Sequence, residues 1–286
     1  MGTDFPRYLA IFPGRQSLKN LRRMLLLAVC LVPVAGGAVL AQEAEKPYEP
    51  TVGQEGKDVV WVPTPYILTE RMLDMAKVTP QDFVMDLGSG DGRNVIAAAR
   101  RGARGRGVEY NPDMVALSRR IAAKEGVDGK AMFVQGDMYE ADISEATVLA
   151  LFLLPENLTR LTPKFLDLKP GSRIVANGFG IEGWDADETS RVEGDCEQWC
   201  TAYLYIVPAK VAGAWNLPHG TLTLQQSFQK LTGSLESDGS KLPLTNGRLH
   251  GDQITFTAGG TDYVGRVNGE AMDGANDAWR AVRARP

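Results

Sequence analysis

Three carboxylates and a run of glycines stand where strands of a sheet are expected to end. Asp86 lies just before the glycines, while Glu109 and Asp137 each follow a later apolar run. The glycine run consists of Gly88, Gly90 and Gly92, separated by Ser89 and Asp91. Glycines let the backbone approach a ligand closely and adopt positive φ angles. A helix-like run follows, and the N–H groups and dipole of a helix N-terminus favour an anionic group.

The residues around this glycine loop argue against a phosphate ligand. Arg93 and Asn94 stand where a P-loop carries Lys and Ser or Thr, and Val95 replaces the third glycine of a dinucleotide fingerprint. Asp86 would repel a pyrophosphate, but it suits a ligand that carries an ammonium or a sulfonium group. S-Adenosylmethionine has an amine, a carboxylate and a sulfonium, so the loop indicates this cofactor.

Strands alternate with helices from about residue 84 to residue 179, and this pattern must position the loop and the carboxylates. It predicts an α/β fold, a Rossmann-like, mostly parallel sheet with helices on both faces. Right-handed crossovers place all the strand carboxyl ends on one edge, where ligands bind in such sheets. The expected strands cover residues 82–88, 104–111, 130–137, 146–155, 172–179 and 200–211, and the expected helices 65–78, 93–102, 112–126 and 157–171.

Three motifs in this order resemble those of class I, seven-strand methyltransferases, which use S-adenosylmethionine. "DLGSGDGR" at 86–93 resembles their first motif, "GVEYNP" at 107–112 their second acidic position, and "QGDMYE" at 135–140 their third. The wider run from Trp61 to Phe179 is similar to the family of ATP-synthase c-subunit lysine methyltransferases and its bacterial relatives. The resemblance does not extend to the N-terminal segment or to the C-terminal residues.

The resemblance implies roles for individual residues. Asp86 and the loop backbone would line the methionine part of the cofactor, Glu109 would accept the ribose hydroxyls, and Asp137 would lie near the adenine amino group. The residues themselves leave alternatives open. Asp91 can instead cap the following helix, and Glu109 and Asp137 can be ordinary surface groups. The implied cofactor-binding residues are Asp86, Gly88, Ser89, Gly90, Asp91, Gly92, Glu109, Tyr110, Asp137 and Met138.

The acceptor implied by the resemblance is a protein lysine or another amine. Methyl transfer to nitrogen needs alignment and exclusion of water rather than a covalent nucleophile. No catalytic residue is therefore assigned; Glu156 either orients an incoming ammonium or caps a helix. Trp61 and Trp184 either line an acceptor groove or pack in the core. The expected substrate-side residues are Leu154, Pro155, Glu156 and Trp184.

Composition excludes some other functions. "LLPEN" at 153–157 replaces the "[DN]PP[YF]" loop of adenine N-methyltransferases, and the net charge is −4, so no nucleic-acid partner is expected. With only two histidines, His219 and His250, no metal site is expected.

Residues 1–41 are expected to form a signal peptide or a membrane anchor. The basic run at 15–23 precedes an uncharged, apolar run that ends at Ala41. This order predicts export, with a periplasmic or envelope location and a possible membrane association. A misassigned start and a cytoplasmic enzyme is the alternative. The export signal also leaves a second function open, that of an exported binding module on a methyltransferase fold without catalytic activity.

The rest of the chain divides into a polar linker at 42–60, a methyltransferase domain at 61–211 and a β-rich module at 212–286. The last of these has Asp-Gly and Asn-Gly turn signals between short alternating runs, which predicts an antiparallel meander or a partial barrel. Cys196 and Cys200 either form a disulfide across a turn or stay as two free thiols, because a straight strand would hold them too far apart.

Overall fold

The computed structural model describes residues 46–237 and 239–285. The expected signal peptide or anchor at residues 1–41 lies outside the described residues.

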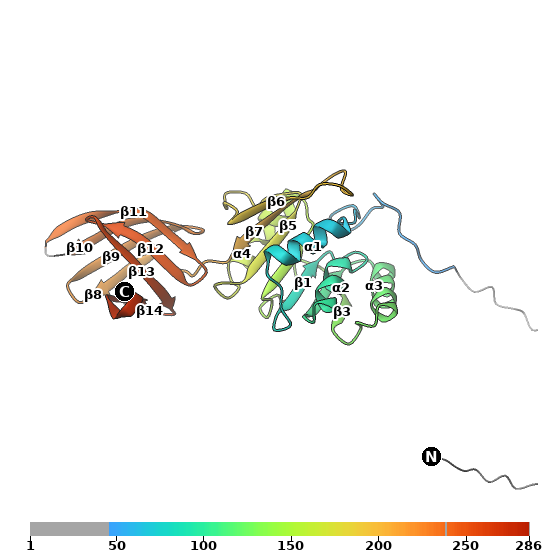
Figure 1. Cartoon of the computed structure of the whole chain (residues 1–286), viewed down its shortest axis with the longest axis horizontal. Helices are drawn as coiled ribbons and strands as arrows, with labels where there is room; N and C mark the ends of the chain where they lie inside the picture. Colours follow the sequence, from blue (N-terminus) through green and yellow to red (C-terminus); the bar gives the residue numbers. More distant parts are fainter. Residues whose placement is uncertain (1–45, 238, 286) are drawn as a thin grey trace, which may run out of the picture. The chain divides into compact units, whose positions relative to one another are not determined.

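A seven-stranded sheet is built from the part of the described chain that precedes residue 207 (Figure 1). The strand order is β3-β2-β1-β4-β5-β7-β6. The first five strands pair in parallel, whereas β7 runs antiparallel to β5 and to β6. The strands are β1 (Phe83–Leu87), β2 (Arg104–Glu109), β3 (Ala131–Gln135), β4 (Val148–Leu151), β5 (Arg173–Asn177), β6 (Glu188–Arg191) and β7 (Thr201–Ile206). The predicted α/β fold is confirmed, and the short, polar β6 is an addition to it.

Both faces of the sheet bury apolar side chains, because its central strands are largely apolar. Alternate residues of β1 and β4 belong to two different core clusters, Val84 with α1 and α2, and Met85 with α4. The helices are α1 (Tyr66–Met75), α2 (Arg93–Arg100), α3 (Pro112–Lys124) and α4 (Pro155–Phe165). In the described chain no helix joins β3 to β4, and Met132 and Val134 of β3 are exposed on that side.

The helices begin and end where local chemistry requires it. Asn111 caps α3, accepting a hydrogen bond from the backbone N–H of Asp113 at 2.9 Å, and Pro112 occupies the first helical position. Gly102 and Gly126 follow α2 and α3 with φ angles of 93° and 68°, which favour glycine. These short connections return the chain to the next parallel strand.

The C-terminal module is a closed, eight-stranded antiparallel barrel. Pairing of β15 with β8 closes it, so the barrel is complete rather than partial (Figure 1). Its core includes the fully buried Trp215 and Phe256. The predicted boundary at 211 and 212 falls in the connection between β7 and β8. The barrel strands are β8 (Gly213–Leu217), β9 (Gly220–Ser227), β10 (Lys230–Ser237), β11 (Ser240–His250), β12 (Gln253–Ala258), β13 (Thr261–Asn268), β14 (Ala271–Gly274) and β15 (Arg280–Arg283), with a short 3-10 helix η1 (Ala275–Asp277).

Cys196 and Cys200 form a disulfide, with their Cα atoms 5.8 Å apart. The turn that the sequence required lies in the loop between β6 and β7, where Trp199, between the two cysteines, has a φ angle of 51°. Two free thiols were therefore the wrong alternative.

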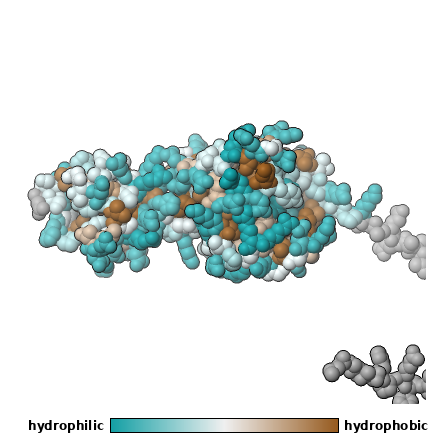
Figure 2. Space-filling view, viewed as in Figure 1, coloured by the Kyte–Doolittle hydropathy of each residue, from teal (hydrophilic) through white to brown (hydrophobic). Residues whose placement is uncertain are grey.

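The face of the molecule shown in Figure 2 is mainly hydrophilic, with apolar side chains in scattered patches. Among these residues, no helix combines the length and the apolar character needed to cross a membrane.

Candidate functional site

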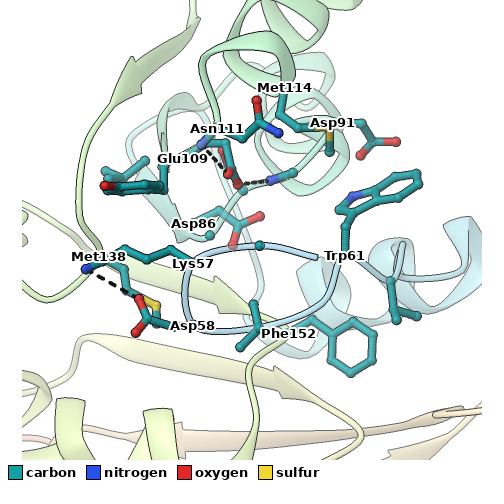
Figure 3. A pocket seen from close by; sticks show the side chains of 18 of the residues that line it. Lys57, Asp58, Trp61, Asp86, Asp91, Glu109, Asn111, Met114, Met138 and Phe152 are labelled. Carbon is teal, nitrogen blue, oxygen red and sulfur yellow. Dashed lines mark hydrogen bonds and ion pairs between the residues drawn. The ribbon is translucent and has the colours of Figure 1, made fainter. Parts of the chain in front are cut away.

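A pocket lies at the carboxyl ends of β1, β2 and β4. It encloses about 870 Å³ of space between the atoms, its open mouth included. Figure 3 shows Asp86, Glu109 and Phe152 around it, with Lys57 and Trp61 on a segment that runs across it. Nine of the ten cofactor-binding residues expected from the sequence line it: Asp86, Gly88, Ser89, Gly90, Asp91, Glu109, Tyr110, Asp137 and Met138.

Glu109, the last residue of β2, has both carboxylate oxygens fixed by backbone donors. One oxygen accepts the N–H of Gly90 and the other the N–H of Asn111, each at 2.9 Å (Figure 3). A carboxylate oxygen can accept more than one hydrogen bond, so both keep acceptor capacity. The side chain is thus held in one orientation at the pocket wall, ready to accept two neighbouring hydroxyl groups.

The glycine loop has a backbone that other residues rarely adopt. Gly88, Gly90 and Gly92 have φ angles of 75°, 53° and 82°. A Cβ atom on Gly90 would come within 2.5 Å of the Trp61 indole nitrogen, so a side chain there would collide with the opposite wall. Gly92 lies behind the pocket as the N-cap residue of α2 and does not line it.

Asp86 is a carboxyl group kept away from water in the floor of the pocket, 3% exposed. Burial raises its pKa well above the ordinary value, and the negative charges of Glu109 and Asp91 raise it further, while a hydrogen bond from the Asn94 amide at 3.1 Å opposes them. Such a carboxyl gains most from a cationic ligand, which would stabilise its ionised form.

Asp91 pairs with the next turn of the chain. Its carboxylate accepts three hydrogen bonds from the Arg93 guanidinium, at 2.9, 3.2 and 2.5 Å, and a weaker one from the Arg93 backbone at 3.3 Å. The same guanidinium donates to the Thr64 carbonyl and lies over the Tyr66 ring. Arg93 therefore links α2 to the segment before α1, and Asp91, which lines the pocket, holds the Arg93 guanidinium in place.

Residues 54–64, which we call the strap, form one wall of the pocket. Two backbone hydrogen bonds shape the strap, from Gly53 N–H to the Trp61 carbonyl and from Trp61 N–H to the Gln54 carbonyl, at 2.8 and 2.9 Å. The interpretation of residues 42–60 as a linker is wrong for this part. The sequence did not predict the strap, because backbone hydrogen bonds determine its conformation and no apolar periodicity marks it.

Asp137 is the point where the strap meets the sheet. Lys57 forms an ion pair with its carboxylate, and the Tyr139 N–H donates to the other oxygen at 2.8 Å. The Lys57 hydrogen bond holds the pKa of Asp137 below its usual range. The Lys57 ammonium also lies 5.2 Å from the centre of the Tyr110 ring. An adenine amino group at Asp137 would therefore share this carboxylate with Lys57.

The expected substrate-side residues are not part of the pocket wall. Leu154 is half-buried, while Pro155 and Glu156 are exposed at the start of α4; none of the three lines the pocket. Trp184 as an acceptor-groove residue is wrong, because it is 3% exposed in the core. Its ring stacks on Phe228 of the loop after β9, with centroids 5.2 Å apart.

Phe152, which directly follows β4, lines the pocket. From the sequence we expected Leu154, Pro155 and Glu156, which follow it, to do so. Phe152 was missed because it continues an apolar run that predicts a buried strand. Its position immediately after the last strand residue was the available signal.

The residues of the pocket fit S-adenosylmethionine. The positive-φ glycines leave room for close backbone approach, the buried Asp86 carboxyl would suit a cationic end, and the fixed Glu109 carboxylate would suit the two hydroxyls of a ribose. The lining residues include no histidine or cysteine. Across the part of the chain that the structure describes, no group of three or more His, Cys, Asp or Glu residues is placed to hold a metal ion.

The strand order and this pocket define a class I methyltransferase, with S-adenosylmethionine as its cofactor. The family model of the ANTKMT methyltransferase domain matches residues 86–188. A protein-lysine N-methyltransferase of Saccharolobus islandicus is 43% identical over 152 residues, which are 52% of this chain and 94% of that protein. The chain belongs to this family of methyltransferases.

Two further similar proteins match different shares of this chain. The ATP-synthase c-subunit lysine N-methyltransferase of Rattus norvegicus is 37% identical over 37% of this chain, and the match spans about half of that protein. A crystal structure described as an RNA methyltransferase from Salinibacter ruber, in complex with S-adenosyl-L-homocysteine, is 45% identical with a TM-score of 0.49. It covers 52% of this chain and 96% of its own. Each of these matches leaves nearly half of this chain or more uncovered.

Proposed function

We propose that this enzyme transfers the methyl group of S-adenosylmethionine to the side-chain amine of a protein lysine. The observation that carries the proposal is the 43% identity to a protein-lysine N-methyltransferase over nearly all of that protein's length. Membership of the family also argues against a module that has lost its catalytic activity.

The chemical step suits the pocket that the chain provides. The neutral amine forms a bond to the methyl carbon while the carbon–sulfur bond breaks, its electron pair stays on sulfur, and the amine then loses a proton to solvent. When bound, S-adenosylmethionine supplies an activated methyl group with a good leaving group. The chain has to align the amine and exclude water, and neither task needs a nucleophilic side chain.

Four side chains of the pocket have a task in this proposal. Glu109 would bind the ribose, and Asp86 would face the cationic methionine end. Trp61 and Phe152, which also line the pocket, would shield the reacting atoms from water.

The test is a transfer assay with the full chain and S-adenosylmethionine that carries a labelled methyl group. Separate reactions contain a panel of lysine-rich basic proteins, the same proteins with their lysines chemically blocked, and total RNA. We expect label on the unblocked proteins, and mass increments of one or more methyl groups on lysine in their peptides. The Glu109→Ala variant is the matched control and should lose the signal at limiting cofactor.

Two results would overturn the proposal. One is label that appears on RNA while the proteins stay unlabelled. The other is label that persists after the lysines are blocked, since the acceptor would then be another group.

We also propose that the enzyme works in an oxidising compartment, outside the cytoplasm. The basic and apolar order of residues 1–41 supports export, and the Cys196–Cys200 disulfide supports an oxidising environment, since such bonds are rare in the cytosol. A reporter fused after Pro50 tests the compartment. Activity of a reporter that works only in the cytoplasm would refute this location.

A further inference from the structure

Three aromatic side chains gather beside the cofactor pocket, on three separate segments. Phe152 follows β4, Phe179 follows β5, and Trp199 lies on the loop between β6 and β7. The Phe152 and Trp199 rings are 5.8 Å apart and tilted, and the Phe152 and Phe179 rings are 6.5 Å apart and stacked. These are ordinary distances for interacting aromatic rings.

This aromatic cluster is continuous with the site already described. Phe152 lines the pocket, whereas Phe179 and Trp199 do not. Phe152 and Phe179 are half-buried, and Trp199 is 40% exposed. The cluster therefore leads from the pocket to the surface, on the side where β4 and β5 end.

The chain holds Trp199 in an unusual position. Its φ angle is 51°, in the left-handed region that bulky residues rarely adopt. The disulfide from Cys196 to Cys200 closes the loop immediately around it. Its side chain also lies directly on Gly178, where an added Cβ would come within 2.9 Å of the indole ring. These contacts hold an exposed indole ring in one orientation, as a residue that positions a ligand requires.

The loop that carries Trp199 is acidic. Glu193, Asp195 and Glu197 are exposed, and none of them forms an ion pair with another residue of the described chain. Unpaired acidic groups attract a basic surface. An aromatic wall, in turn, packs against the alkyl stem of a lysine and attracts its ammonium.

We propose that Trp199, fixed by the Cys196–Cys200 disulfide, forms with Phe152 and Phe179 the aromatic entrance that receives the acceptor lysine. Trp199 is a positioning and specificity residue for the acceptor and does not touch the cofactor. The acidic loop around it favours lysines in basic sequence surroundings. This inference rests on the proposed lysine acceptor and adds the residues that select it.

The test compares steady-state kinetics of the full chain with its variants, on the protein of the panel that is methylated most efficiently. For Trp199→Ala we expect the KM for the acceptor to rise about tenfold, while the Kd for S-adenosylmethionine stays within about twofold. Trp199→Phe should recover much of the loss. Val264→Ala, which removes an exposed apolar side chain from the barrel, is the control and should match the parent.

The disulfide is tested with a reductant and with the double variant Cys196→Ser, Cys200→Ser. Reduction should raise the acceptor KM of the parent, and the double variant should show the raised KM without a further response. A response that persists in the double variant would assign the effect elsewhere and overturn the role of the disulfide.

The possible failures are distinguishable. If the parent methylates lysine but Trp199→Ala leaves the acceptor KM unchanged, the aromatic entrance is overturned and the lysine activity stands. If Trp199→Ala weakens cofactor binding as strongly as acceptor binding, the residue supports the pocket rather than the acceptor, and the inference fails. If the parent transfers no methyl group to lysine, the proposed function fails, and this inference with it.

Discussion

Replacement of Glu109 by alanine should weaken the binding of S-adenosylmethionine about 100-fold. The carboxylate is oriented by the Gly90 and Asn111 N–H groups at 2.9 Å, so little ordering is needed when two hydroxyls bind it. A hydrogen bond to a charged group contributes roughly 1.5–3 kcal/mol, and two of them about 3–6 kcal/mol. The side chain is half-buried, so we take about 3 kcal/mol, close to two factors of ten in Kd.

The assay is isothermal titration calorimetry of the full chain with S-adenosylmethionine and with S-adenosylhomocysteine. Glu109→Asp keeps the charge but shortens the reach, so its loss should be intermediate, about tenfold. Glu156→Ala is the matched control, because that carboxylate is exposed and lies outside the pocket, and it should change Kd by less than about twofold. An unfolding curve for each variant separates lost affinity from lost structure.

One result would refute the reasoning. If Glu109→Ala folds normally and binds the cofactor within about threefold of the parent, the carboxylate does not hold the ribose. The two backbone hydrogen bonds would then have a purely structural purpose, the connection of β2 to the glycine loop.

Other variants test the remaining features. Asp86→Asn should raise the melting temperature of the cofactor-free enzyme and should weaken cofactor binding. The pKa of Asp86 is raised in the folded enzyme, so the folded enzyme loses stability as the pH rises above the ordinary value of 3.8, and the neutral amide avoids this loss. A variant that unfolds at a lower temperature than the parent near pH 7 would contradict this. Burial opposes the ionisation of Asp82, yet the Thr79 N–H and the Arg173 guanidinium hold its pKa below 3.8, so its stabilisation is present above that pH and is lost as the pH falls through the lowered pKa. In denaturation measured as a function of pH, Asp82→Asn should reduce the loss of unfolding free energy at acid pH. An unchanged loss would mean that other groups cause it. Trp215→Ala should cost about 4 kcal/mol of unfolding free energy, measured by denaturant, because the side chain is fully buried in the barrel; a loss below about 1 kcal/mol would mean that the barrel core is loosely packed.

The sheet and its binding edge could be predicted because their signals are local. A short apolar run, a glycine loop and a helix start follow one another directly at residues 83–100, and the same succession places Glu109 at the end of a strand. Parallel topology then brings these strand ends together without any further information. The cofactor followed from the charge of Asp86 beside the loop.

Other features depend on contacts between distant residues, and no local pattern predicts them. Trp61 was one of two alternatives in the sequence, a groove residue or a core residue, and only its contact with Gly90 places it on the pocket wall. No local pattern marks residues 54–60 as part of the same wall. Trp184 is buried because Phe228, more than 40 residues later, stacks on it. The barrel closes through β8 and β15, which turn signals cannot pair with each other.

The strap bears on the time that each turnover takes. Because it forms a whole wall of the pocket, we expect spent cofactor to have a long residence time, so that its release rather than methyl transfer limits the rate. Its two attachments differ in kind: Lys57 holds Asp137 by charge, whereas Trp61 covers Gly90 by contact. Ionic strength weakens only the first. Salt should therefore speed product release until the apolar attachment alone determines the residence time.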